Sequence, residues 1–219
     1  RDDVESRGLG DVYKRQLMLL PCFAACGKLP YEEGTFEAAS AVNSVSIEAR
    51  DRRVEIALAD GDRVKLEYYR NEKEYYDITE SDGALSVTLK YDKEWTDYIG
   101  AGGDRDKQVI RVYIPKDGLE RLSVSTTGRD VLLDGISAEE ITLSTNNGDI
   151  ALQSVAAGSS LTAAAKNGSV KGSIVGSYDV FQMDISVKKG NSNIMSKSGG
   201  EKFLKIDVNN GDIEINFTA

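Results

Sequence analysis

One short pattern occurs five times in the second half of the chain. The copies begin at Leu122, Ile141, Leu161, Met183 and Leu204, so successive starts are 19, 20, 22 and 21 residues apart. A nearly constant period is typical of repeat architectures, in which each unit buries its apolar side against the next. This period constrains the fold more than any other feature of the sequence.

Each copy predicts two short strands joined by a tight turn. In the second copy Ile141, Leu143 and Thr145 alternate with polar residues, which is typical of a strand with one buried face. A turn built on glycine follows, and then a second short strand, as at residues 150–152. The predicted turn residues are Gly128, Asn147, Gly148, Asp149, Asn167, Gly168, Gly190, Asn210, Gly211 and Asp212.

Two architectures fit this pattern. Asn-Gly between alternating runs is a strong hairpin signal, so a sandwich of hairpins fits each copy alone. The period favours an all-β fold, a β-solenoid with about 20 residues per coil, in which the coils stack at strand spacing. Leu143 would then lie beside Val124 and Ala163. In the same way Ile206 would lie beside Ile185.

The N-terminal β region, residues 45–120, is less regular than the repeat region, residues 121–219. Strand patterns are present at 45–49, 54–58, 64–68, 75–79, 85–89 and 109–114. They predict either the opening coils of the same solenoid or a small sandwich that caps it. The polar and small residues of 27–44 predict a tether in front of the domain.

The N-terminal segments predict processing rather than fold. Residues 1–16 are charged and aperiodic, and they resemble a translated adapter sequence fused to the gene; the alternative is an ordinary disordered tail. Residues 17–26 end in Ala24-Ala25-Cys26 and resemble the end of a bacterial lipoprotein signal, or else a buried apolar segment. On the first interpretation Cys26 carries the lipid, and the mature protein is extracytoplasmic and membrane-anchored.

The composition excludes several classes of site. The formal charge of -9 argues against nucleic acid as a partner, because phosphate binding needs a basic face. The chain has no histidine, which excludes Ser-His-Asp and Cys-His catalysis. Both cysteines, Cys22 and Cys26, precede the domain, so a cysteine zinc site is excluded from it. No cofactor is expected.

The acidic turns raise the possibility of calcium. Asn147, Asp149 and Asp212 offer the oxygen ligands that calcium prefers. Their spacing differs from the glycine-rich repeats of calcium-binding β-rolls, and turn chemistry alone explains Asn-Gly. We therefore expect structural turns and no metal site.

The aromatic residues supply the candidate binding surface. Six of the ten tyrosines lie between residues 68 and 98, and the only tryptophan is Trp95. Tyr91, Trp95 and Tyr98 therefore predict a surface for a glycan or protein ligand, because exposed aromatics anchor such contacts. The alternative is that they cap the apolar end of the solenoid.

An enzyme is the less favoured alternative. The carboxylate pairs Glu139-Glu140 and Asp104/Asp106 are of the type that glycosidases use, and β-helix polysaccharide lyases use lysine or arginine as the base. The repeats contain no concentrated basic cleft. We expect no catalytic residues.

A strand at 109–114 ends in Pro115, Leu122-Ser-Val-Ser-Thr follows, and Asn-Asn-Gly-Asp-Ile recurs at 146–150 and 209–213. Residues 43–217 thus resemble the bacterial putative-adhesin family of β-strand repeats, of the DUF4097 type. The resemblance implies a β-solenoid-like fold, surface exposure and no established catalysis. It predicts a non-enzymatic surface lipoprotein, an adhesin or envelope-binding domain; the alternative is an envelope-stress sensor or accessory protein.

Overall fold

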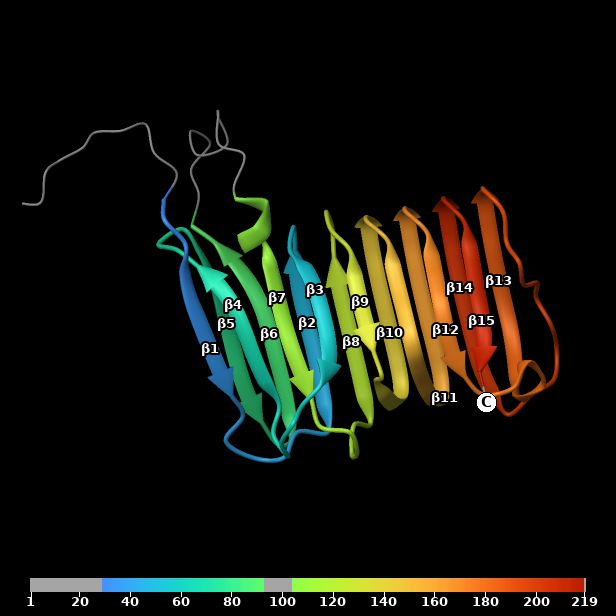
Figure 1. Cartoon of the computed structure of the whole chain (residues 1–219), viewed down its shortest axis with the longest axis horizontal. Helices are drawn as coiled ribbons and strands as arrows, with labels where there is room; N and C mark the ends of the chain where they lie inside the picture. The colour runs from blue at the N-terminus through green and yellow to red at the C-terminus, as the bar shows by residue number, and fades with distance from the viewer. Residues whose placement is uncertain (1–28, 93–103, 219) are drawn as a thin grey trace, which may run out of the picture.

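The described part of the chain is built mainly from β-strands. The computed structural model describes residues 29–92 and 104–218, and within these ranges 15 strands join in one strongly curled sheet (Figure 1). The strands are β1 (Glu32–Glu37), β2 (Ser44–Arg50), β3 (Arg53–Leu58), β4 (Lys65–Arg70), β5 (Glu74–Ser81), β6 (Ala84–Tyr91), β7 (Val109–Ile114), β8 (Arg121–Thr126), β9 (Val131–Asp134), β10 (Ser137–Asn147), β11 (Ile150–Asn167), β12 (Val170–Val175), β13 (Phe181–Lys189), β14 (Lys202–Asn210) and β15 (Ile213–Thr218). Two 3-10 turns, η2 (Arg105–Lys107) and η3 (Tyr178–Val180), complete the described elements. None of the described elements is a helix that could cross a membrane.

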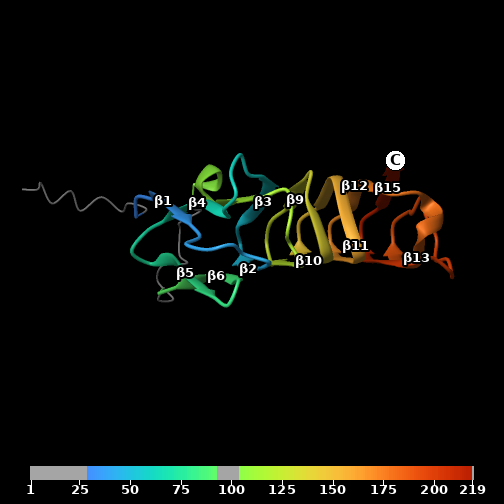
Figure 2. The same cartoon turned by 90° about the horizontal axis from the view of Figure 1, so that it is seen from below.

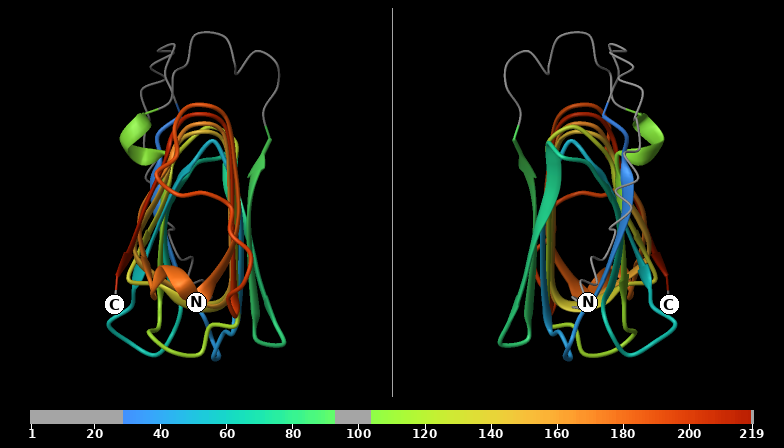
Figure 3. Two further views of the ribbon diagram at one scale, coloured as in Figure 1. Left: turned by 90° about the vertical axis from the view of Figure 1, so that its right-hand side faces the viewer. Right: turned by 90° about the vertical axis from the view of Figure 1, so that its left-hand side faces the viewer.

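The sheet curls into two opposite layers of strands, called face A and face B, with the core between them. Face A has the strand order β1-β4-β7-β3-β9-β11-β12-β15, and face B has the order β5-β6-β2-β8-β10-β11-β14-β13 (Figure 2). Strand β11 belongs to both, because Ile150–Gln153 pairs with β9 and its later residues pair with β10. The end-on view in Figure 3 shows the chain wrapping around the enclosed interior.

The predicted neighbours of the repeats are confirmed. Leu143 pairs with Val124 on one side and Ala163 on the other, and Ile206 pairs with Ile185. All of these pairs are parallel, so the hairpin interpretation of the repeats is wrong. Leu143 and Ala163 are fully buried, because alternate side chains of each strand point into the space between the faces.

The repeats do not stack strictly in chain order. Leu161 pairs with Leu204, and Leu204 pairs with Met183, so the last copy is inserted between the third and the fourth. Residues 191–200 then cover the outer edge of the sheet. The Lys197 backbone forms an isolated antiparallel β-bridge with the Met183 backbone. The Asn193 side-chain amide donates a hydrogen bond to the Ile215 carbonyl at 2.9 Å. Covering the edge in this way removes the open strand that would otherwise pair with another chain.

The N-terminal region both extends and caps this stack. Strands β2 and β3 lie parallel to β8 and β9, and therefore continue faces B and A. Beyond them β5 and β6 form an antiparallel hairpin, and β4 is antiparallel to both β1 and β7. All six strands predicted between residues 45 and 114 are present. Part of the region therefore continues the two faces, and part adds antiparallel strands at their ends.

The prediction of a tether over 27–44 is wrong for its central part. Residues 32–37 form β1, which pairs with β4 along its whole length. Phe36 packs against the core, and Ala38 is buried. Gly34 gives the Tyr68 ring room, since a Cβ there would lie 2.5 Å from Tyr68 Cε2. The predicted leader, residues 1–16, and signal remnant, residues 17–26, lie outside the described residues.

Candidate functional site

The predicted turn residues form a ladder along one edge of the molecule. Asn167 Nδ2 donates to Asn147 Oδ1 at 2.9 Å, and Asn210 Nδ2 donates to Asn167 Oδ1 at 2.7 Å. Below them the glycines touch each other: a Cβ on Gly168 would lie 1.9 Å from the Gly148 carbonyl oxygen. The turns are therefore in direct contact from one copy to the next.

The remaining glycines of the ladder are equally confined. A Cβ on Gly211 would lie 2.2 Å from the Gly168 oxygen, and one on Gly190 would lie 1.9 Å from the Gly211 oxygen. Gly128 stands apart from this stack, and its amide donates to the Arg50 carbonyl at 3.1 Å. Close backbone approach thus explains why glycine recurs in these turns.

The acidic turn residues serve the same ladder. Asp149 Oδ1 accepts a hydrogen bond from the Ser169 amide at 2.7 Å, and Asp212 Oδ1 accepts one from the Asn191 amide at 2.8 Å. Nowhere in residues 29–92 and 104–218 do three or more His, Cys, Asp or Glu side chains gather as a group that could hold a metal ion. These carboxylates satisfy the backbone of the neighbouring turn, which supports the structural interpretation over calcium.

The predicted aromatic surface is placed only in part. Tyr91 is described; Trp95, Tyr98 and the lipidation residue Cys26 lie outside the described residues, and their roles stay predictions. The Tyr91 hydroxyl donates to the Asp51 carboxylate, and the Arg50 guanidinium lies 5.4 Å from the centre of its ring. The half-buried Tyr91 side chain is thus held by a polar cluster.

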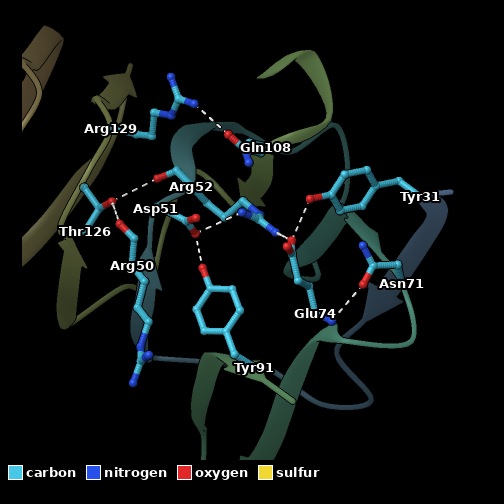
Figure 4. Close-up of polar contacts among 10 residues, drawn as sticks. All are labelled: Tyr31, Arg50, Asp51, Arg52, Asn71, Glu74, Tyr91, Gln108, Thr126 and Arg129. Atoms are coloured by element: carbon cyan, nitrogen blue, oxygen red, sulfur yellow. Dashed lines mark hydrogen bonds and ion pairs between the residues drawn. The ribbon is translucent and has the colours of Figure 1, made fainter. Parts of the chain in front are cut away.

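That internal cluster, the Arg52 cluster, consists of Tyr31, Asp51, Arg52, Glu74 and Tyr91 (Figure 4). Arg52 is fully buried, and it forms an ion pair with Glu74, which is 5% exposed. Arg52 Nη1 lies 2.9 Å from Asp51 Oδ1, and the Tyr31 hydroxyl donates to Glu74 Oε2 at 2.6 Å. The cluster draws on both faces, since Tyr31 directly precedes β1 of face A and Glu74 begins β5 of face B.

Local backbone geometry turns Arg52 inward. Arg50 adopts a left-handed conformation with φ of 46°, and the Arg52 amide donates to the Ala49 carbonyl at 2.9 Å, which closes a tight turn between β2 and β3. The Thr126 hydroxyl fastens this turn at a distance of 3.0 Å from the Arg52 carbonyl. Because successive residues alternate in direction, Arg52 points into the protein and Arg53 points out of it.

Burial keeps the tyrosines of the cluster protonated. Burial, together with the hydrogen bond to Glu74, raises the pKa of Tyr31 to about 12. Burial and the hydrogen bond to Asp51 raise the pKa of Tyr91, and burial raises that of Tyr76, which lies beside Arg52. Arg52 is buried and forms an ion pair with Glu74, although its Nε has no hydrogen-bond partner among the described residues, so we assign the cluster a structural role.

A second group of charges lies on the outer surface of face A. Parallel strands β3, β7 and β9 begin at the same edge, so the residues at their starts converge. Four arginines gather there around a hollow of about 320 Å³, which we call the arginine hollow: Arg53, Arg105, Arg111 and Arg129. The sequence separates these residues widely, and only the parallel pairing brings them together.

Hydrogen-bond acceptors of Glu55 and Gln108 lie between these arginines. Arg53 Nε lies 3.1 Å from Glu55 Oε1, and Arg111 Nε lies 3.0 Å from Glu55 Oε2, so one carboxylate bridges two guanidinium groups. Arg129 Nη2 donates to Gln108 Oε1 at 2.6 Å. The hollow therefore combines strong hydrogen-bond donors with acceptors on a rigid sheet.

The carboxylates singled out in the sequence make local contacts. Glu140 Oε2 lies 3.2 Å from Arg121 Nε on the surface of face B. Asp104 caps the η2 turn, since its Oδ1 accepts a hydrogen bond from the Asp106 amide at 3.2 Å. Asp106 also lines the arginine hollow, together with Glu55 and Asp130.

Comparison with known families agrees with this fold. The family model described as Toastrack DUF4097 matches residues 42–219. The chain belongs to this family. No curated protein matches it. Membership confirms the resemblance seen in the repeats.

Two solved structures are similar to the chain. A putative cell adhesion protein from Clostridium sporogenes is 15% identical, and the match covers 87% of this chain and 100% of that one with a TM-score of 0.58. A putative adhesin from Bacteroides fragilis is 14% identical over 84% of this chain and 97% of that one, with a TM-score of 0.29. At this identity the first likeness shows a common fold.

Sequence reasoning missed the arginine hollow and the Arg52 cluster of this family member. One signal was present: Arg53 and Glu55 have the spacing of neighbours on one strand face, and Arg111 occupies an outward position in its own strand. Recognising the hollow required knowing that β3 and β7 pair in parallel with Glu55 opposite Arg111.

Proposed function

We propose that this protein is a non-enzymatic lipoprotein of the bacterial cell envelope, anchored through Cys26 and acting as an adhesin or envelope-binding domain. The repeat region, 121–219, acts as a β-solenoid of about 20 residues per coil that extends the sheet carrying the binding surface. The anchor fixes one end, and the ligand is bound on the flank of the sheet.

The arginine hollow is the observation that carries this proposal. It places four guanidinium groups on the outside of a sheet whose strands are paired on both sides. A rigid scaffold that presents several charged donors is suited to recognition, because little freedom is lost when a ligand binds. In contrast, the polar side chains of the turn ladder make their hydrogen bonds within the ladder. Those of the Arg52 cluster make their contacts within the cluster.

The chemistry present supports binding rather than turnover. The sequence contains no histidine, and Glu55, the carboxylate at the centre of the hollow, is held by two guanidinium groups. Incubation with acidic and neutral polysaccharides should therefore release no new reducing ends. Steady release that depends on residues of the hollow would contradict the proposal.

An adhesion assay tests the binding function. Beads coated with the full mature protein should adhere to extracellular-matrix or glycan-coated surfaces more than beads coated with a charge-matched control protein. Adhesion only to isolated envelope of the producing cell would move the function to the envelope-stress alternative. Trp95→Ala, tested in the same assay, shows whether the predicted aromatic surface contributes.

A labelling experiment tests the anchor. With a complete signal sequence in front of residue 17, a fatty-acid analogue should be incorporated into the wild-type protein and not into Cys26→Ala. Equal labelling of both proteins would rule out Cys26 as the attachment site.

A further inference from the structure

We infer that the arginine hollow binds the carboxylate of an acidic sugar, so that the ligand is a polysaccharide containing uronic acids. This inference rests on the proposed binding function and specifies its chemistry. It does not involve Tyr91, Trp95 or Tyr98.

The charge of the hollow calls for a single anion. Four arginines face three carboxylates, those of Glu55, Asp106 and Asp130, which leaves a net charge of 4 - 3 = +1 in a chain whose formal charge is -9. Asp130 Oδ1 already accepts a hydrogen bond from the Asp149 amide at 2.9 Å. One carboxylate per sugar unit matches the surplus, whereas the closely spaced phosphates of a nucleic acid would meet the three carboxylates.

Two arginines of the hollow keep hydrogen-bond donors that their contacts with Glu55 do not use. Arg53 and Arg111 each contact Glu55 through Nε, and a guanidinium has five N–H groups. Within the described chain, neither guanidinium makes another hydrogen bond or ion pair. Their side chains are 45% and 41% exposed, so the remaining N–H groups are within reach of a ligand. Arginine binds planar carboxylates through two parallel hydrogen bonds, which favours a carboxylate ligand.

The acceptors of the hollow favour a sugar over an acidic peptide. A uronic acid carries several hydroxyl groups beside its carboxylate, and these can donate to Glu55, Asp106 or Gln108. An extended peptide would pair with a free sheet edge, but β3 is already paired with both β7 and β9. The hollow also lacks an apolar pocket, since Val109 is its only apolar lining residue and is 5% exposed. Its volume of about 320 Å³ suits a short segment of a longer polysaccharide.

Titration calorimetry on the full mature protein tests this assignment with two probes, tetragalacturonate and a hyaluronan tetrasaccharide. Saturable binding of either probe, weakened by added salt, is expected. The matched neutral probe is methyl-esterified tetragalacturonate, which should bind at least about tenfold more weakly because it lacks the charge-assisted hydrogen bonds. The relative affinities of the two acidic probes separate a pectin-like source from an animal-matrix source.

Two variants locate the site. Arg105→Gln and Arg111→Gln should each weaken binding of the acidic probe by about tenfold or more. Arg121→Gln is the matched control, because Arg121 lies on face B, is 62% exposed and also contacts a carboxylate. Thermal melting confirms that each variant is folded. Arg105 makes no ion pair within the described residues, so its replacement tests ligand binding without a structural loss.

Each contrary result is distinct. Equal binding of the esterified probe would overturn carboxylate recognition. If Arg121→Gln lost as much affinity as the hollow variants, or if the hollow variants lost none, the hollow would not be the binding site. Competition by hexaglutamate at the affinity of the uronates would assign the hollow to peptides and overturn the sugar. If neither acidic probe binds while coated beads still adhere to matrix, this inference fails and the proposed function stands.

Discussion

Asn167 stands between two other asparagines, donating to Asn147 Oδ1 at 2.9 Å and accepting from Asn210 Nδ2 at 2.7 Å. The three residues come from three separate turns, and two of those turns are adjacent in space although 43 positions apart in the chain. Each amide satisfies the next in the row. The ladder thus fixes the register of the strands that lead into it, which explains the recurrence of asparagine at these positions.

Replacing the central asparagine should weaken the ladder. Asn167→Asp removes the Nδ2 donor to Asn147 and adds a charge beside the Asn147 oxygen, so we expect a loss of about 1–2 kcal/mol of unfolding free energy. Asn216→Asp is the control, because Asn216 is an exposed residue of β15 that has no place in the ladder. Urea unfolding compares the two. Equal losses would show that the ladder contributes nothing specific.

The stacked glycines predict a larger effect. Gly168 has φ of 157°, and a Cβ there would lie 1.9 Å from the Gly148 oxygen, so Gly168→Ala must move a backbone turn. We expect a cost of about 1–3 kcal/mol or more. Gly61→Ala should be nearly neutral, since a Cβ at Gly61 would meet nothing within 4 Å. A melting temperature unchanged by Gly168→Ala would contradict the observed contact.

The strands were predictable because the information that specifies them is local. Alternation of apolar and polar residues assigned β2 to β7, and the period placed Leu143 beside Val124 and Ala163. The order of the last copies was not predictable. Met183 and Leu204 present the same kind of side chain to a neighbour, so the pattern does not decide which of them pairs with Leu161.

The charged sites could not be predicted for a related reason. Arg52 lies in a run of charged residues at a turn, where exposure is the usual outcome. It is buried because Glu74, 22 residues away, reaches it from another hairpin. Likewise Glu55 and Arg111 are 56 residues apart and meet only through the pairing of β3 with β7. No local periodicity specifies contacts of this range.

The alternation in β10 predicts opposite responses to the same substitution. Leu143 is fully buried between Val124 and Ala163, so Leu143→Asp would bury an unpaired charge at a cost of several kcal/mol. Ser144 points to the outside, and Ser144→Asp should change the unfolding free energy by less than about 0.5 kcal/mol. If urea midpoints of the two variants coincided, the assignment of the inner face would be wrong.

The Arg52 cluster predicts a loss of stability at alkaline pH. The pKa of Tyr31 is raised from its ordinary value of 10.0 to about 12, so the folded state holds this proton more tightly than the unfolded state does. The resulting stabilisation is complete below about pH 10 and is lost as the pH rises from about 10 through 12. The raised pKa values of Tyr76 and Tyr91 act in the same direction.

Tyr31→Phe measures the share of one residue in this loss. The variant lacks the hydrogen bond to Glu74, so it should be less stable at neutral pH but lose less stability between pH 10 and 12. Tyr75→Phe is the control, since Tyr75 is 45% exposed and lies outside the cluster. Chemical unfolding at several pH values gives the slope of unfolding free energy against pH for each protein. A slope in Tyr31→Phe equal to that of the wild type would contradict the assignment.

The buried pair of Arg52 and Glu74 leads to a prediction about coupling. Glu74→Ala leaves a fully buried guanidinium with only the half-exposed Asp51 as its anion, so we expect a loss of about 3–5 kcal/mol. The double variant Arg52→Met/Glu74→Leu removes both charges and keeps the volume filled. It should therefore be more stable than Glu74→Ala, because desolvating two charges costs about as much as their attraction returns. A double-mutant cycle by urea unfolding, built from Arg52→Met, Glu74→Leu and the double variant, gives the coupling free energy. If the two losses simply added, the pair would be independent, and Arg52 would owe its burial to packing rather than to Glu74.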